Sequence, residues 1–466
     1  MTHAKGGSET TSCRPAIQDA GREVTRAGAN CDRSLLLCRG IKGLLRCDDA
    51  EVVSGIARYL MSQHGSLRRG SSLMERARGT ALPPLTALLG GLRSFLEVRP
   101  VVRLDGAVWV ARYGNERRAV EQLPPLLPEL GWTELKFHWR PDAAALCALT
   151  RSFGPTWRRI IRIARLLHRR YEFFRVLRVV ELIGFYLRFL AVFRGGRFEL
   201  AVTSNHSNPH GIAFNLAARR CGVPVVLVAH GMPVRPVARL SYDLAVVHCE
   251  AARQTYLEAG CRMDRVLVHG RRQHHVPMPA CLPPGRLTVG IFLCKDVNEE
   301  RLRAVTMRLL GHPRVSRILI RPHPTNLWAG LDAWVASQNA PRLYRSPGGD
   351  VFRDIEASDI VLAGNSSVLV EAVIAGRPGG YVPGLDCGPP DLHAFVAQGL
   401  IYPIDDGSDF DPDAILRFYQ RPDWVNALRL FANIEEDEAS VAARVGAALR
   451  ELVAMRAVAA WDIGPK

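Results

Sequence analysis

The sequence predicts an α/β protein with two Rossmann-like domains that face a cleft, preceded by an N-terminal helical extension. The chain has 466 residues, of which 48% are hydrophobic, and this is enough for two ordinary domains with cores of their own. Short apolar strands alternate with helical segments along most of the chain, which is typical of parallel sheets. Prolines 277, 279, 283 and 284 predict a rigid linker between two such series.

The predicted organisation has five parts. Residues 1–30 contain no apolar segment like that of a secretion signal, and we expect a flexible tail there. Residues 31–95 hold helical apolar patterns between glycine-rich breaks, which predict a helical extension. An N-terminal Rossmann-like domain over residues 96–276 and a C-terminal Rossmann-like domain over residues 285–410 follow. Terminal helices over residues 411–466 are expected to pack back on them.

The first domain opens with two apolar runs at residues 101–104 and 107–113. The turn-forming pair Asp105-Gly106 joins them, which predicts a hairpin or a strand pair. A helix over residues 116–130 and a short strand complete a βαβ pattern. Further strands are predicted at residues 198–202, 223–228, 243–247 and 266–268.

Residues 156–194 carry arginines at helical spacing. Arg158, Arg162, Arg165 and Arg169 share one helix face, while apolar residues follow the same period on another. No stretch here reaches the roughly 20 apolar residues that a membrane span requires. Two interpretations remain open: a basic amphipathic helix that contacts the anionic inner face of the cytoplasmic membrane, or an ordinary helix with a solvated arginine face.

The chain is basic, with 61 Lys and Arg against 45 Asp and Glu and a net charge of +16. Nucleic acid, an anionic membrane or a phosphate-rich substrate would each suit this charge, and so would a general enrichment in arginine without a function. Nucleic-acid binding is disfavoured because the arginine stripe lacks interleaved aromatic residues and no reader motif occurs. The 11 cysteines form no CxxC pair, so we expect reduced thiols in a cytoplasmic protein with no metal and no cofactor.

A proline-flanked histidine follows one strand of the second domain, in the segment Arg321-Pro322-His323-Pro324. Ligands of open α/β sheets bind at the carboxyl ends of the strands, so this motif lies where a ligand is expected. The prolines fix the backbone and would hold Arg321 and His323, both donors to phosphate oxygens, toward the crevice. A turn that merely uses proline is the alternative.

A second motif, Gly364-Asn365-Ser366-Ser367, follows another predicted strand and opens a helix. Small residues let the backbone approach a ligand, and free N–H groups and hydroxyls there favour an anion. Ordinary helix capping by Ser or Asn is the alternative. Glu371, one turn into that helix, could accept hydrogen bonds from ribose hydroxyls or merely complement the helix dipole.

Three histidines lie at strand ends in the first domain. His230 directly follows a buried strand and precedes a glycine, and an imidazole at that position suits a general base near neutral pH. His206 and His210, in the polar loop after a neighbouring strand, are the second choice as bases or acceptor-binding groups. A structural role for any single histidine is the alternative.

The segment RPHP, followed further along the chain by ASDIVLAGNSSVLVEAVIAGRPGGYV, resembles the donor half of GT-B glycosyltransferases that build bacterial surface polysaccharides. The likeness is to sialyl- and polysialyltransferases, to Kdo-type capsule transferases and to CDP-glycerol glycerophosphotransferases. By this resemblance, His323 and Pro324 form the HP motif that contacts the donor phosphate. Ser366 and Ser367 bind phosphate oxygens, and Glu371 binds the nucleotide ribose.

The segment VAHGMP is similar to the HG segment of the glycerophosphotransferases, whose histidine is a proposed base, and this match points to His230. The resemblance implies a metal-independent GT-B enzyme that moves a sugar from a CMP-, UDP- or GDP-linked donor. The acceptor would be a polysaccharide or glycolipid of capsule, exopolysaccharide or lipopolysaccharide synthesis. Arg321, Gly364 and Asn365 would belong to the donor site. A CDP-alcohol phosphotransferase of the teichoic-acid type and a non-catalytic subunit of a polysaccharide assembly or export machine are the alternatives.

Overall fold

The computed structural model describes residues 42–43, 74, 76–77, 80–99, 105–138, 147, 149–153, 156–169, 171–233, 237–269, 275–324, 328, 330–404 and 410–462. The chain divides into two compact units, a helical one and one that contains two β-sheets. The expected extension over residues 31–95 lies largely outside the described residues. The helical unit also takes in residues 137–192, which the sequence assigns to the first Rossmann-like domain.

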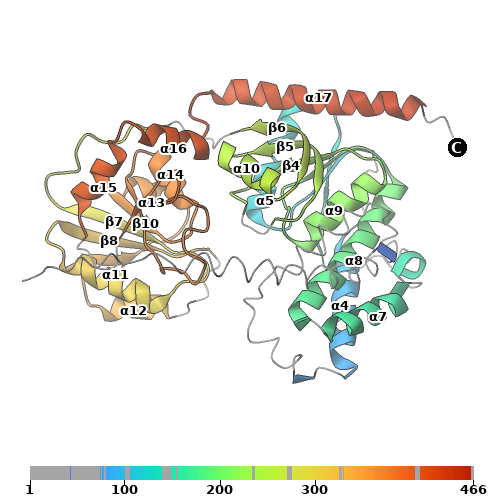
Figure 1. Cartoon of the computed structure of the whole chain (residues 1–466), viewed down its shortest axis with the longest axis horizontal. Coiled ribbons are helices and arrows are strands. Elements are labelled where there is room, and N and C mark those ends of the chain that lie inside the picture. The colour runs from blue at the N-terminus through green and yellow to red at the C-terminus, as the bar shows by residue number, and fades with distance from the viewer. Residues whose placement is uncertain are drawn as a thin grey trace, which may run out of the picture. The chain divides into compact units, whose positions relative to one another are not determined.

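The helical unit is built on α4 (Leu82–Glu97), α7 (Trp157–His168) and α8 (Phe173–Gly195) (Figure 1). Most of α8 is buried, and its Arg188 donates through Nε to the carbonyl oxygen of Val98 at 3.1 Å. Helices α4 and α8 approach closely, because a Cβ on Gly184 would clash with the carbonyl oxygen of Gly91. Of the residues that the structure describes, no helix combines the length and apolar character needed to cross a membrane.

Helix α7 separates apolar and basic residues onto two faces. Ile160, Ala164 and Leu167 are buried, and the four arginines expected to share a face are exposed, namely Arg158, Arg162, Arg165 and Arg169. The predicted arginine face is therefore confirmed as a solvent-exposed surface.

The first sheet has six parallel strands in the order β2-β1-β3-β4-β5-β6. The strands are β1 (Asp105–Val110), β2 (Trp132–Leu135), β3 (Arg197–Thr203), β4 (Val225–Val228), β5 (Ser241–Val247) and β6 (Arg262–Val268). The chain leaves β1 on one side for β2 and continues on the other side with β3, so the winding reverses between β1 and β3. Ligand crevices of such sheets open at the carboxyl edge beside this reversal.

The expected hairpin before the first helix is wrong. Asp105 and Gly106 are not a turn but the first residues of β1, which pairs in parallel with both neighbours. Residues 101–104 lie outside the described part of the chain. Gly106 has a φ of 74°, and the register between β1 and β3 shifts between Gly106 and Ala107. The glycine therefore permits the backbone conformation that this strand irregularity requires. A Cβ there would also clash with the carbonyl oxygen of Gly131.

Helices cover the first sheet. The helix expected over residues 116–130 ends early: α5 (Gly114–Val120) is followed by a separate 3-10 turn at Pro124–Leu126, because proline cannot continue the hydrogen-bond ladder. The other helices of this part of the chain are α9 (Pro209–Arg220) and α10 (Glu250–Glu258). The last helix, α17 (Glu438–Asp462), drawn in red in Figure 1, buries Val441, Val445 and Leu449 in the core of the first sheet.

The second sheet has six parallel strands in the order β12-β11-β10-β7-β8-β9. The strands are β7 (Leu287–Phe292), β8 (Val315–Arg321), β9 (Leu343–Arg345), β10 (Ile360–Ala363), β11 (Gly379–Tyr381) and β12 (Tyr402–Pro403). Read from β9, this is the third-second-first-fourth-fifth-sixth order of dinucleotide-binding sheets, with its reversal between β7 and β10. The prediction of two Rossmann-like sheets is confirmed.

Helices of the second sheet complete its βα units. They are α11 (Glu299–Gly311), α12 (Leu331–Ser337), α13 (Val351–Glu356), α14 (Val368–Ile374), α15 (Pro412–Tyr419) and α16 (Trp424–Phe431). Strands β7, β8 and β10 are apolar along most of their length and buried, as expected for parallel strands covered on both faces. The polar residues of this part of the chain therefore gather in the loops at the strand ends.

Candidate functional site

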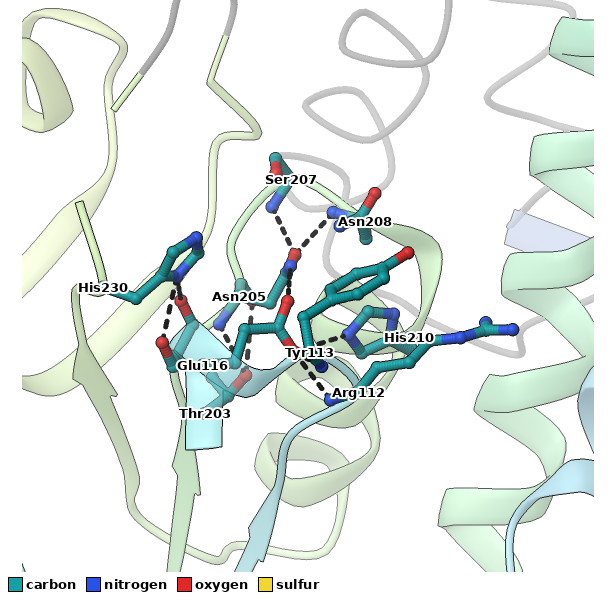
Figure 2. Close-up of polar contacts among 10 residues, drawn as sticks. Arg112, Tyr113, Glu116, Thr203, Asn205, Ser207, Asn208, His210 and His230 are labelled. Atoms are coloured by element: carbon teal, nitrogen blue, oxygen red, sulfur yellow. Dashed lines mark hydrogen bonds and ion pairs between the residues drawn. The ribbon is translucent and has the colours of Figure 1, made fainter. Parts of the chain in front are cut away.

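A buried carboxylate ties together the two loops at the reversal point of the first sheet (Figure 2). Glu116 follows β1, whereas Asn205 and His210 follow β3. The Glu116 carboxylate accepts hydrogen bonds from the side-chain amide of Asn205 and, at 2.7 Å, from the backbone N–H of Arg112. The Nε2 atom of His210 lies 3.4 Å from the same carboxylate. The Asn205 carbonyl oxygen in turn accepts from the N–H groups of Ser207 and Asn208 at 3.0 and 2.6 Å, which fixes the loop before α9.

The Glu116–His210 pair is closed to solvent, with side-chain exposures of 1% and 2%. Burial alone would raise the pKa of Glu116. The hydrogen bond and charge of His210, with the donors from Arg112 and Asn205, outweigh burial and lower this pKa to about 2. His210 is therefore held as the partner of an ionised carboxylate, and its ring is not accessible to an acceptor.

His206 is also buried. Its Nδ1 atom lies 2.8 Å from the hydroxyl of Tyr256, and the two rings meet edge to face. Burial, with a smaller effect from His230, lowers the pKa of His206 to about 3. The ring is therefore neutral at physiological pH and packs as part of the protein interior.

His230, in contrast, is half-buried and lies two residues after the end of β4. Its Nδ1 atom lies 2.7 Å from the carbonyl oxygen of Ser204 and 3.0 Å from the Ser204 hydroxyl (Figure 2). A carbonyl oxygen can only accept, so Nδ1 carries the proton and donates it. This fixes the tautomer and leaves the lone pair on Nε2, as a general base requires.

His230 lines a pocket of about 360 Å³ within the sheet-containing unit. Its other polar lining residues are Asn115, Arg118, Gln122, His248, His269, Ser367 and Glu371. The floor is apolar and includes Val228 and Val247, the last residues of β4 and β5. The pocket thus combines one oriented imidazole with hydrogen-bonding groups and an apolar floor, which is typical of small-molecule sites.

Sequence reasoning missed several of these lining residues. His248 and His269 directly follow β5 and β6, as His230 follows β4, so the rule that selected His230 would have found them. Asn115, Arg118 and Gln122 carried no comparable signal, because α5 could not be oriented from the sequence. Among the described residues, no group of three or more His, Cys, Asp and Glu side chains is placed to hold a metal ion.

In the second sheet, Arg321 is engaged by its own surroundings. Its guanidinium pairs with Asp354 and donates to the carbonyl oxygens of Gly349 and Asp350 at 2.5 and 3.2 Å. These contacts fasten the loop after β9 to the end of β8. The structure therefore gives Arg321 a structural task, in place of the open guanidinium that the sequence suggested.

His323 is exposed, two residues after the end of β8. Partial desolvation of its ring, with a smaller effect from Lys295, lowers the pKa of His323, while Asp296 acts in the opposite direction. Lys295 and Asp296 belong to the loop after β7. Because their charges act on His323, the loops after β7 and β8 lie close together at one corner of the sheet. Pro324 is exposed beside His323.

Asn365 is held by neighbouring loops. Its backbone N–H and its side-chain amide donate to the two oxygens of Asp386 at 2.6 and 2.9 Å, and its side-chain oxygen accepts from the N–H of Leu392 at 2.7 Å. A Cβ on Gly364 would clash with the Asp386 carboxylate, so the glycine permits this contact. Asn365 therefore fixes the shape of the loop after β10.

The serines and Glu371 differ from Asn365. Ser366 accepts a long hydrogen bond, 3.4 Å, from the backbone N–H of Val368, whereas Ser367 and Glu371 line the pocket that contains His230. Of the two serines expected to bind phosphate, Ser367 is the one that lines this pocket.

Asp386 joins the loops on both sides of the reversal point of the second sheet. It lies in the loop after β11, bonds Asn365 after β10, and forms an isolated bridge with Val297 after β7. Burial, together with Asp386, raises the pKa of the neighbouring Cys294 thiol to about 12. Sequence reasoning missed Asp386 and Lys295, although Lys295 follows the first strand of a dinucleotide-type sheet, where a ligand contact is expected.

No protein-family model matches the chain, and no curated protein matches it. Among solved structures, the calicheamicin glycosyltransferase CalG4 aligns with 14% identity and a TM-score of 0.46, over 78% of this chain and 100% of that one. HepE of Anabaena in complex with UDP-glucose aligns with 12% identity and a TM-score of 0.39, over 74% and 99%. The Neisseria meningitidis UDP-GlcNAc 2-epimerase bound to UDP-GlcNAc aligns with 11% identity and a TM-score of 0.42, over 74% and 99%.

Proposed function

We propose that the chain is a glycosyltransferase that moves a sugar from a nucleotide-activated donor to a hydroxyl of an acceptor. The observation that carries this proposal is the pocket that His230 shares with Ser367 and Glu371. It combines an imidazole whose Nδ1 is held by the Ser204 carbonyl oxygen with a serine and a glutamate beside a dinucleotide-type sheet. A base next to groups that suit a nucleotide is what sugar transfer requires.

The proposed reaction assigns one task to each side of the pocket. His230 takes the proton from the acceptor hydroxyl through Nε2 as the acceptor oxygen bonds to the anomeric carbon. The bond from that carbon to the donor phosphate breaks, and the negative charge passes to the leaving nucleotide. Ser367, His323 and Lys295 stabilise that charge, and Glu371 accepts hydrogen bonds from the ribose hydroxyls.

The remaining predicted site residues take supporting positions in this proposal. Arg321 and Asn365 hold the loops that carry His323 and Ser367, since their own polar atoms are engaged within the protein. His206 and His210 are buried in the segment after β3 that begins with Ser204, the partner of His230. They support the base and do not act as alternatives to it.

The acceptor in this proposal is a bacterial surface polysaccharide or glycolipid, as the motif resemblance implies. Transfer of an alcohol phosphate from a CDP-alcohol and a non-catalytic role in a polysaccharide machine remain the alternatives. Mass analysis of the product separates sugar transfer from alcohol-phosphate transfer, because the first leaves a glycosidic bond and the second leaves a phosphodiester. Binding of a nucleotide sugar without turnover would favour the non-catalytic role.

We further propose that the helical unit contacts an anionic membrane surface, on the evidence of two exposed helix faces. Helix α7 presents four arginines without an acidic residue, and α4 packs beside it. Leu82, Leu85 and Leu89 lie on one side of α4 and are 49%, 46% and 62% exposed. Because α8 is mostly buried, the contact falls on α4 and α7 rather than on the whole of residues 156–194. A basic surface with exposed leucines is what an anionic interface binds.

The donor site is tested by substituting the exposed histidine. We expect His323→Ala to lower the transfer rate about 10²- to 10³-fold, the usual effect of removing one donor to developing charge. Its melting temperature should stay unchanged, because the side chain is exposed. Asn433→Ala, at a half-buried polar residue outside the pocket that contains His230, serves as the control. Full transfer activity in His323→Ala would remove this histidine from the donor site.

A further inference from the structure

The first-sheet side of the pocket carries a row of imidazoles. His230 lies two residues after β4, and His248 and His269 directly follow β5 and β6; the three strands are neighbours in the sheet. Adjacent strands lie about 4.8 Å apart, so the three rings follow one another along the carboxyl edge. All three are half-buried and line the same pocket.

Helix α5 and the turn after it add to this first-sheet wall, which comprises the lining residues Asn115, Arg118, Gln122, His230, His248 and His269. Asn115, Arg118 and Gln122 recur at intervals of three and four residues, which places them on one face, and all three line the pocket. The neighbouring Arg117 points elsewhere, because its guanidinium pairs with Glu134 and lies over the ring of Trp109. Arg118 is thus the cation that α5 directs to this wall.

The charge of this wall favours an anion. Among the lining residues that the structure describes, no carboxylate comes from the first sheet or its helices, and the one acid is Glu371 after β10. The nearby Glu116 is buried and bonded to Asn205 and His210. A guanidinium, imidazoles and amides approach from separate elements, which suits the several oxygens of a tetrahedral phosphate better than a flat carboxylate.

We propose that this wall is a subsite for a phosphate group carried by the acceptor, with Arg118, His248 and His269 as its donors. His230 then remains available for the acceptor hydroxyl. The inference rests on the proposed sugar transfer only in calling the ligand an acceptor, since the binding of a phosphate ester can be measured without turnover.

The test follows the histidine rings of the full chain by NMR after selective ¹⁵N labelling, with the signals assigned by single substitutions. The probe is glucose 1-phosphate, and glucose is its neutral counterpart. We expect the His248 and His269 signals to shift with glucose 1-phosphate and not with glucose. Arg118→Gln should raise the Kd for glucose 1-phosphate at least about tenfold, since charge-assisted hydrogen bonds are the strong ones. Arg117→Gln, one residue away, should leave the Kd unchanged.

Two results would overturn the proposal. One is an equal response to glucose and glucose 1-phosphate, or no response to either. The other is a Kd that survives Arg118→Gln but is lost in Ser367→Ala, which would put the phosphate at the loop after β10. Failure of the proposed sugar transfer is a separate result, because it appears as a lack of nucleotide binding or of sugar transfer and leaves the phosphate titration unaffected.

A second pair of probes identifies the source of the phosphate. Farnesyl phosphate and farnesol, both in detergent, repeat the comparison with a lipid-linked ester. Binding of farnesyl phosphate that is tighter than that of glucose 1-phosphate and weakened by Arg118→Gln supports a lipid-linked acceptor. The reverse order of affinities, with the same dependence on Arg118, supports a soluble or glycan-borne phosphate.

Discussion

Glu116 connects two loops that are far apart in the sequence and adjacent at the ligand edge of the first sheet. Its carboxylate holds Asn205, and Asn205 shapes the turn that leads from β3 into α9. The same turn begins with Ser204, which orients His230. The geometry of the proposed base therefore depends on a buried residue that is not among those that line the pocket.

This dependence gives a stability prediction with a defined pH range. The pKa of Glu116 is lowered from 4.5 to about 2, so its contribution to the free energy of unfolding is present above pH 4.5 and is lost as the pH falls toward 2. We expect Glu116→Gln to lose about 3 kcal/mol at pH 7, and the difference from the wild type to shrink below pH 4.5. Urea unfolding of the wild type and the variant at pH 7 and at a pH below 4.5 measures this difference in the free energy of unfolding.

The control for this prediction is Glu121→Gln on the same helix end. Glu121 is exposed and lies 3.9 Å from Arg117, a pair worth little in water. An equal loss of stability in the two variants, or a difference for Glu116→Gln that does not change with pH, would contradict the role given to the buried carboxylate.

A second prediction concerns Gly364. A Cβ at this position would meet the Asp386 carboxylate, which bonds the backbone N–H and the amide of Asn365. We expect Gly364→Ala to cost about 1–3 kcal/mol and to weaken nucleotide binding, because the loop after β10 must move. Gly311→Ala, where no atom lies within 4 Å, is the matched control. Calorimetry gives the melting temperatures of both variants. An unaltered melting temperature in Gly364→Ala would reject the close contact between Gly364 and Asp386.

The sequence predicted where site residues would lie better than it predicted their tasks. His206, His210 and His230 all follow strands of the first sheet, as expected from alternating apolar and polar segments. What separates them is burial against Tyr256 and Glu116, 50 and 94 residues distant along the chain. Contacts of that separation leave no local pattern, so a single sequence could not rank the three histidines.

At the scale of elements, local sequence gave most helices but not their ends or their pairing. The arginine face of α7 follows from the helical period alone, and the structure exposes it. The parallel pairing of β1 was missed because Asp-Gly is a strong turn signal, and only the neighbouring β2 and β3 make Gly106 a strand residue. Tertiary pairing overrode a local preference there.

The prediction at this scale concerns membrane binding by α7. We expect the full chain to sediment with phosphatidylcholine vesicles that contain phosphatidylglycerol, and not with phosphatidylcholine alone. Replacing Arg158, Arg162 and Arg165 by Gln should weaken binding roughly a hundredfold, at about 1 kcal/mol for each basic residue near an anionic surface.

The matched control removes the same charge elsewhere: Arg417, Arg421 and Arg429 are exposed on or beside α15 and α16 and become Gln. Equal effects of the two triple variants would reduce the binding to net charge and reject a specific surface on α7.

At the scale of the whole molecule, the alternation of strands and helices was enough to predict two parallel sheets. It was not enough for their strand orders, because the side on which each crossover returns is decided by packing and leaves no mark on the strand itself. The orders matter for function, since they put the reversal points between β1 and β3 and between β7 and β10. The assignment of residues 137–192 to the helical unit was also missed, because it is decided by the packing of these helices and leaves no local pattern in the sequence.

The central claim is that the second sheet binds a nucleotide beside Ser367, and thermal unfolding with CMP, CDP, UDP and GDP tests it most directly. A ligand that binds only the folded state at about 100 times its Kd adds about 2.7 kcal/mol of stability, so one nucleotide should raise the melting temperature clearly. Ser367→Ala should reduce that shift, and Arg118→Gln should not. Unchanged melting with all four nucleotides, or a shift that is indifferent to Ser367→Ala, would contradict the proposed donor site.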